Sequence, residues 1–167
     1  MTTVATSPDL AALYAAHRHS LVRMAVLLVD DLASAEDVVQ DAFVAFHRNA
    51  AGLDDPGAAL GYLRVCVVNG ARSVIRRRQV ARKYQHLELQ PDEAAADIEA
   101  MLADEHRTVL RAMRRLPDRQ REVLTLRYWS DLSEAQIAEA LGISKGAVKS
   151  NASRGMRRLG EILGVSA

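Results

Sequence analysis

Residues 141–159 carry five basic residues and no acid, together with a regular apolar spacing, and this stretch constrains the fold more than any other. The apolar positions recur at steps of four, four, three and four: Val148, Ala152, Met156, Leu159 and Leu163. This spacing predicts one face of an α-helix, for which Ser144 can act as the N-cap. Polar residues on another side fall within an arc of about 140°: Lys149, Ser150, Ser153, Arg154 and Arg157. Such a face is either simply solvated or a binding surface for a polyanion.

A second short helix is predicted directly before this one. Ser133-Glu134-Ala135-Gln136 has the pattern of a capping box, and Gly142 ends the helix that it opens. Gly142 tolerates the backbone conformation of a tight turn, and Ile143 fills the angle between the two helices. The pair is typical of a helix-turn-helix, whose second helix enters the major groove of DNA. The alternative is a helical hairpin packed for stability alone, which the cap, the glycine and the basic face together disfavour.

The rest of the sequence also predicts helices, and no strand pattern or internal repeat is evident. Aromatic residues make up only 4% of the chain, and the few glycines and prolines separate the periodic segments. Ser7-Pro8-Asp9 has the features of a helix start. The predicted helices before the capping box cover about 10–29, 34–48, 59–78, 104–115 and 117–129. We therefore expect an all-α protein.

Charge is segregated along the chain, although the net charge is only +1. Residues 56–87 hold seven bases and no acid, and residues 106–167 hold twelve bases and six acids. Between them, residues 88–105 hold seven acids and no base. Two basic blocks separated by an acidic strip favour two surfaces for a polyanion. Residues 80–103 lack strong apolar periodicity, and we interpret them as an acidic, flexible linker.

The predicted helix at 59–78 carries polar residues opposite its apolar face: Asn69, Arg72 and Arg76. Asparagine donates and accepts hydrogen bonds, and arginine can bind phosphate or a guanine edge. These side chains are candidates for nucleic-acid binding. The alternative is that they form the solvated end of a core helix.

The predicted helix at 34–48 differs, because the residues opposite its apolar face include acids and a valine but no base: Asp37, Gln40, Asp41 and Val44. An acidic face with an exposed valine would repel DNA and suits a basic protein surface. The alternative is that these acids only stabilise the positive N-terminal end of their own helix.

Three stretches of the chain resemble a known family when they are taken in order. "AEDVVQDAF", "YLRVCVVNGARSVIRRR" and "LPDRQREVLTLRYWSDLSEAQIAEALGISKGAVKSNASRGMRRL" are similar to group IV, or extracytoplasmic-function (ECF), sigma factors of the sigma-70 family. The alanine-rich composition resembles that of actinobacterial members. The resemblance implies two small helical domains, a sigma-2-like bundle at 7–79 and a sigma-4-like helix-turn-helix domain at 104–165, joined by the linker 80–103. It also implies that the linker threads toward the active-centre and RNA-exit channels of the polymerase.

The resemblance also implies roles for the candidate residues. The first domain would bind the β′ clamp helices of core RNA polymerase through Asp37, Gln40, Asp41 and Val44. It would melt and hold the −10 element through the loop at 50–58 and through Asn69, Arg72 and Arg76. The second domain would read the −35 element as duplex through Lys145, Lys149, Ser150, Ser153, Arg154 and Arg157. Other partners that the resemblance implies are the β flap of the polymerase and, in members that have one, an anti-sigma factor.

The sequence also bears on two other classes of function. A helix-turn-helix regulator acting without core polymerase explains residues 133–163 but leaves the acidic helix and the acidic linker unexplained. An enzyme is disfavoured, because the five histidines are scattered or diverge and no catalytic, cofactor or metal-binding cluster is evident. No apolar run is long enough to span a membrane, no secretory signal is visible, and a single cysteine excludes an internal disulfide. We therefore expect a cytoplasmic protein that is not inserted in a membrane.

Overall fold

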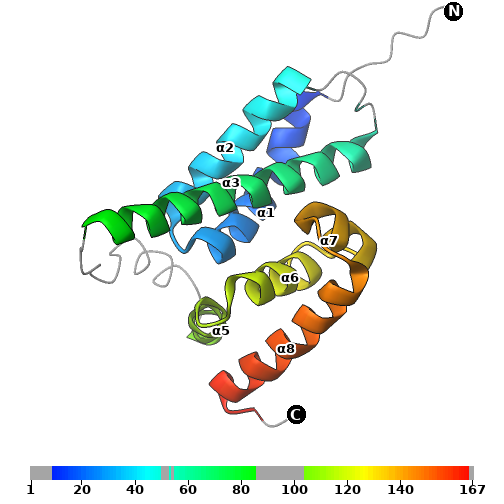
Figure 1. The fold of residues 1–167 in the computed structure, drawn as a ribbon. Helices are drawn as coiled ribbons and strands as arrows, with labels where there is room; N and C mark the ends of the chain where they lie inside the picture. Colours follow the sequence, from blue (N-terminus) through cyan, green and yellow to red (C-terminus); the bar gives the residue numbers. More distant parts are fainter. Residues whose placement is uncertain (1–8, 50–52, 54, 86–103, 166–167) are drawn as a thin grey trace, which may run out of the picture.

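The computed structural model describes residues 9–49, 53, 55–85 and 104–165, and within these ranges it contains helices and no strand. The all-α expectation is therefore confirmed (Figure 1). The helices are α1 (Leu10–Val29), α2 (Leu32–Asn49), α3 (Pro56–Gln85), α5 (Asp104–Arg114), α6 (Asp118–Tyr128), α7 (Glu134–Leu141) and α8 (Lys145–Leu163). None of the described helices is long and apolar enough to cross a membrane.

The first three helices form a bundle in which each helix packs against the other two (Figure 1). The second half of α1 is almost entirely buried, from Met24 to Val29, because α2, α3 and α6 all pack against it. The corner between α1 and α2 is fixed by Asp31, whose carboxylate accepts a hydrogen bond from the backbone N–H of Ser34 (2.7 Å) and is paired with Arg78 of α3. The bundle is thus held by apolar burial and by one ion pair at its corner.

The last four helices form a second unit in which α8 packs against α5, α6 and α7. The inner face of α8 comprises Val148, Ala152 and Gly155, which are buried. Leu124 of α6 is buried against Gly155, where an added Cβ atom would lie only 3.1 Å from the leucine Cδ1. Small residues at the inner positions therefore allow α8 to approach α6 closely.

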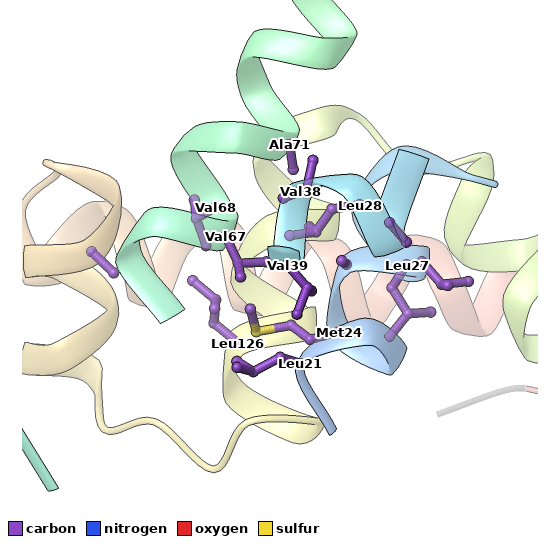
Figure 2. Packing of buried hydrophobic residues seen from close by; sticks show 14 of the residues in the cluster. Leu21, Met24, Leu27, Leu28, Val38, Val39, Val67, Val68, Ala71 and Leu126 are labelled. Atoms are coloured by element: carbon purple, nitrogen blue, oxygen red, sulfur yellow. The ribbon is translucent and has the colours of Figure 1, made fainter. Parts of the chain in front are cut away.

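The two units share one continuous buried cluster. The helices that join them are α1 with α5 and α6, and α3 with α7. Leu126 of α6 belongs to the same cluster as Leu21 and Met24 of α1, and Figure 2 shows these side chains lying together. Nearby, the buried hydroxyl of Ser130 donates a hydrogen bond to the sulfur of Met24 (2.9 Å). The contact between the two halves is therefore partly apolar.

Three details differ from the sequence expectations. Helix α3 ends at Gln85 instead of about 78, so that residues 80–85 of the expected linker are helical. Asp9 itself caps α1, accepting a hydrogen bond from the N–H of Ala11 (3.1 Å). Met156, expected on the apolar face of α8, is 45% exposed, because Gly155 occupies the place of closest approach to α6.

Some of the expectations fall on residues that the structure does not describe. These are Ser7 and Pro8 of the expected helix start, residues 50–52 and 54 of the loop at 50–58, and residues 86–103 of the linker.

Candidate nucleic-acid interface

The helix-turn-helix is positioned by local hydrogen bonds at both of its helix starts. Ser133 forms the predicted capping box: its hydroxyl accepts from the N–H of Gln136 (3.2 Å), and the side chain of Gln136 accepts from the N–H of Ser133 (2.9 Å). Gly142 ends α7 with a φ of 63°, a left-handed conformation that favours glycine. Ser144 caps α8 by accepting from the N–H of Ala147 (3.1 Å). These predictions are confirmed.

The residues expected to contact the −35 element all lie on α8. Those with exposed side chains are Lys145, Lys149, Ser153, Arg154 and Arg157, and Ser150 is half-buried. The helix thus presents polar and basic side chains to solvent while its other side packs against α6 and α7. No element of the described chain covers the exposed residues.

The contacts within this basic face are weak. Arg154 donates to the hydroxyl of Ser150 at 3.4 Å, and the Lys149 ammonium lies 3.8 Å from the carboxylate of Glu134. Glu134 also pairs with Arg127 of α6 at 3.6 Å. Exposed pairs of this kind contribute about 0–1 kcal/mol, so the cationic groups can exchange these partners for a phosphate at little cost. Arg127 and Glu134 were not among the DNA-binding candidates from sequence, because only the fold brings Arg127 close to the start of α7.

The residues expected to contact the −10 element lie on α3 but differ in their surroundings. Asn69 and Arg76 are exposed. Arg72 is instead held by Glu122 of α6 in a double ion pair, with Nε donating at 2.9 Å and Nη2 at 3.1 Å. A cavity of about 300 Å³ lies at this seam, and its lining includes Arg72, Arg76, Arg119 and Glu122. Helix α3 therefore places the three residues on one side, as expected, whereas α6 covers one of them.

A second group of charges joins the two halves at the end of α1. Asp30 caps α1 with a φ of 67°, and its carboxylate lies 3.1 Å from Arg121 and 3.5 Å from Arg114. Arg121 is buried and also pairs with Asp118 at 3.1 Å. Burial raises the pKa of the Asp30 carboxyl above its usual value, and the two guanidinium groups offset this only in part.

The residues expected to bind the polymerase lie on the exposed side of α2. Asp37, Gln40 and Asp41 are exposed, and Val44 is 46% exposed. Gln40 and Val44 line an open, mainly apolar groove of about 610 Å³ between α1 and α2, and Tyr14 of α1 contributes to it. Asp37 and Asp41 lie outside its lining.

Tyr14 of α1 was not among the candidate site residues from sequence. The structure leaves it 39% exposed, with its ring packed edge-on against Phe43 (5.0 Å between centroids).

Among the described residues, no three histidine, cysteine, aspartate or glutamate side chains are placed to hold a metal ion. The arrangement is instead one of polar, basic and acidic helix faces, which is suited to binding macromolecules.

Comparison with known proteins places both halves of the chain in one family. Residues 13–88 match the model of sigma-70 region 2, and residues 106–159 match that of sigma-70, region 4. Similar proteins include the ECF RNA polymerase sigma factor SigK of Mycolicibacterium vanbaalenii, which is 32% identical over 93% of this chain and 82% of its own length. The RNA polymerase sigma-E factor of Streptomyces avermitilis is 34% identical over 86% of this chain and 79% of its length.

Another relative is the ECF sigma factor SigM of Mycobacterium tuberculosis, which is 31% identical over 91% of this chain and 76% of its own length. Among solved structures, the sigma factor RpoE in its complex with the anti-sigma factor NepR from Bartonella quintana has a similar fold. The TM-score is 0.70 with 22% identity, over 95% of this chain and 96% of that one. From the two matched regions and these relatives, the chain belongs to the ECF RNA polymerase sigma factors of the sigma-70 family.

Proposed function

We propose that this sigma factor uses three separate helix faces: one for core RNA polymerase, one for the −10 element and one for the −35 element of a promoter. The proposed domains are residues 7–79 and 104–165, with the linker 80–103 between them. The chain would act in the cytoplasm, where polymerase and promoter meet, and its proposed role requires no catalysis of its own.

The −35 surface is the exposed side of α8. In a helix-turn-helix, the N-terminal part of the second helix meets base edges in the major groove, and later residues meet the backbone. Lys145, Lys149 and Ser150 lie in the first two turns, and Ser153, Arg154 and Arg157 follow on the same helix. The arginines can bind a guanine edge or a phosphate with two donors, and the lysines supply point charges for phosphates.

The −10 surface is the side of α3 that carries Asn69, Arg72 and Arg76. Single-stranded DNA is held by backbone contacts and by stacking, for which the exposed amide and guanidinium groups are suited. In this proposal the loop at 50–58 contributes to the same surface and helps to open the duplex.

The polymerase surface is the exposed side of α2, formed by Asp37, Gln40, Asp41 and Val44. Its acids cannot serve the DNA surfaces, since they would repel phosphate. They suit a basic protein surface such as the β′ clamp helices, and the adjoining apolar groove with Tyr14 adds area that a protein partner can bury. The β flap is a second proposed contact of the polymerase, and an anti-sigma factor would compete for some of these faces.

One observation carries the proposal: each of the three sets of candidate residues lies on one side of one helix, within a half that matches a sigma-70 region, and most of these residues are exposed. The test is to add the protein to core polymerase and to sequence the 5′ ends of the transcripts. We expect transcript start sites that are preceded by shared −10 and −35 sequences. These start sites should appear only when both the protein and core polymerase are present. DNA-dependent regulation that persists without core polymerase would instead support a stand-alone regulator.

A residue-level test separates the surfaces. Arg154→Ala should weaken binding of the holoenzyme to a double-stranded −35 fragment by about tenfold to a hundredfold, at a fixed salt concentration. The matched control is Arg115→Ala, which removes an exposed arginine outside α8 and should leave binding unchanged. Reversing Asp37 and Asp41 to lysine should abolish core binding with the helical content intact. Normal core affinity in that variant would refute the assignment of α2.

A further inference from the structure

The cavity of about 300 Å³ between α3 and α6 has an excess of positive charge in its lining. Arg72 and Arg76 line it from α3, and Arg119 and Arg121 line it from α6. Asp118 is also in the lining and pairs with Arg121 at 3.1 Å. Among the described residues of the lining, the other three guanidinium groups are accompanied by one further carboxylate, which leaves an excess of two positive charges. A site with this balance favours an anion.

The second carboxylate of the lining, that of Glu122, does not use all of the donors around it. One of its oxygens accepts from Nε of Arg72 at 2.9 Å, and the other accepts from Nη2 of Arg72 at 3.1 Å and from Nη1 of Arg119 at 2.9 Å. A guanidinium has five N–H donors, so each of these arginines keeps donors that Glu122 does not bind. Arg76 is exposed, and no carboxylate in the described part of the chain pairs with it. Three arginines can therefore donate to a further anion while the ion pairs of Glu122 stay intact.

The cavity also has an apolar wall, formed by Leu28 of α1 and by Ala71 and Ile75 of α3. Leu28 and Ala71 are buried, so this wall is part of the packed core. Sites for small molecules combine apolar walls with a few polar groups and have volumes of about 300–1,000 Å³. The wall therefore suits a small ligand in which a largely apolar body is attached to the anionic group.

A phosphate monoester matches the three arginines better than a carboxylate does. It carries a charge of about −1.5 to −2 at pH 7 and has three terminal oxygens that accept strong hydrogen bonds. These properties match the excess of two charges and the three guanidinium groups of the cavity. A carboxylate has a single charge and two oxygens, so it would leave part of the positive charge without a partner.

We propose that the cavity between α3 and α6 is a binding site for a small phosphate monoester of the size of a mononucleotide. Arg72, Arg76 and Arg119 hold the phosphate, and the flat body of the ligand packs on the apolar wall. Because the cavity is lined from both halves, the ligand binds their packed arrangement and stabilises the folded chain. This site is independent of the roles proposed for DNA, since Arg119 of α6 lies outside the proposed −10 surface.

The test is isothermal titration calorimetry on the full-length protein at one fixed salt concentration, with AMP, inorganic phosphate and adenosine as probes. AMP has both the phosphate and the flat body, whereas each of the other probes has only one of them. AMP should bind about tenfold or more tightly than either. Thermal unfolding with the same probes detects binding that releases no heat, because a ligand of the folded state raises Tm.

Each other outcome of these titrations overturns a named part of the proposal. Equal binding of adenosine and AMP would show that the arginines do not hold the phosphate. Equal binding of inorganic phosphate and AMP would show that the apolar wall is not used and that the ligand is not a monoester of this kind. If no probe binds or raises Tm, the site itself is refuted.

Two variants locate the bound AMP. Arg119→Gln removes a guanidinium from the α6 side and Arg76→Gln removes one from the α3 side, and each should weaken AMP binding about tenfold. Arg115→Gln is the matched control, because it removes an exposed arginine that is not in the described lining and should leave AMP binding unchanged. Helical content measured by circular dichroism identifies any variant that fails to fold.

The pattern over the folded variants decides whether the cavity is the site. If only Arg76→Gln weakens binding, AMP is held by α3 alone and the site between α3 and α6 is refuted. If neither variant weakens binding, or if the control weakens it as much, AMP binds elsewhere and the proposal is again refuted. A loss of AMP binding in both variants, with none in the control, is the expected result.

Discussion

Gly155 provides a quantitative test of how closely α8 packs against α6. An added Cβ atom at this position would lie 3.1 Å from Cδ1 and 3.2 Å from Cγ of Leu124, and 3.4 Å from Cβ of Gln120. Leu124 is only 1% exposed, so its side chain has little room to move away. Relieving such an overlap in a packed core costs about 1–3 kcal/mol. Against this, alanine is favoured over glycine in a helix by about 1 kcal/mol.

The expected net effect of Gly155→Ala is therefore a loss of about 0–2 kcal/mol in the free energy of unfolding. Gly61 offers the matched control, because it lies within α3 and an added Cβ atom there meets no atom within 4 Å. Gly61→Ala has only the helix preference to gain, so it should stabilise the protein by about 1 kcal/mol.

The measurement is urea unfolding followed by circular dichroism on both variants and the wild type. The two alanine variants should differ by about 1–3 kcal/mol, with Gly155→Ala the less stable. Equal stability of the two would refute the close packing of α8 on α6. Valine at 155 should be less stable still, because its two methyl groups extend the overlap.

Three further results are expected. Ser133→Ala should cost about 1 kcal/mol in thermal unfolding, because it removes the N-cap of α7; no loss would contradict the capping box. Leu126→Ala should cost about 2–5 kcal/mol in urea unfolding, since it opens a cavity in the seam between the halves, whereas a loss below 1 kcal/mol would indicate that the seam is loosely packed. Burial of Asp31 opposes its ionisation, but hydrogen bonds from Ser34 and Arg78 outweigh it and hold the pKa below its usual value of 3.8. The stability that Asp31 supplies is therefore present above pH 3.8 and is lost as the pH falls through the lower folded pKa. Asp31→Asn should remove this part of the acid dependence of the free energy of unfolding. A variant whose stability changes with pH as that of the wild type does would argue against it.

Much of the fold could be predicted from sequence because its determinants are local. The helices follow from the apolar period, and the starts of α7 and α8 follow from Ser133 and Ser144, whose caps involve residues only three positions away. The end of α3 was placed too early, because the loss of apolar periodicity beyond about residue 78 was taken as the boundary. Residues 79–85 contain no glycine or proline and several good helix formers, so nothing in the backbone chemistry ends the helix there.

The arrangement of the two halves could not be predicted in the same way. Arg72 and Glu122 are 50 positions apart, and Asp30 and Arg121 are 91 apart. A charge pair between such distant residues has no local signature in a single sequence. The face of α3 was therefore identified, but not the helix that covers part of it. The exposure of Met156 was missed for a related reason. The apolar period marks one face of α8, but it does not show that the small Gly155, and not Met156, lies closest to α6.

The buried contact of Met24 and Leu21 with α6 has a consequence for genetics. Both residues lie in the first helix, outside every surface that we assign to DNA or polymerase, and both are almost completely buried. A smaller side chain at either position would leave a cavity between the two halves and lower the stability of the chain. A loss of about 1–2 kcal/mol can change the amount of a protein in the cell several-fold. In a selection for lost expression from a target promoter, mutations in this part of α1 would therefore be recovered, although neither residue lies on an assigned contact surface.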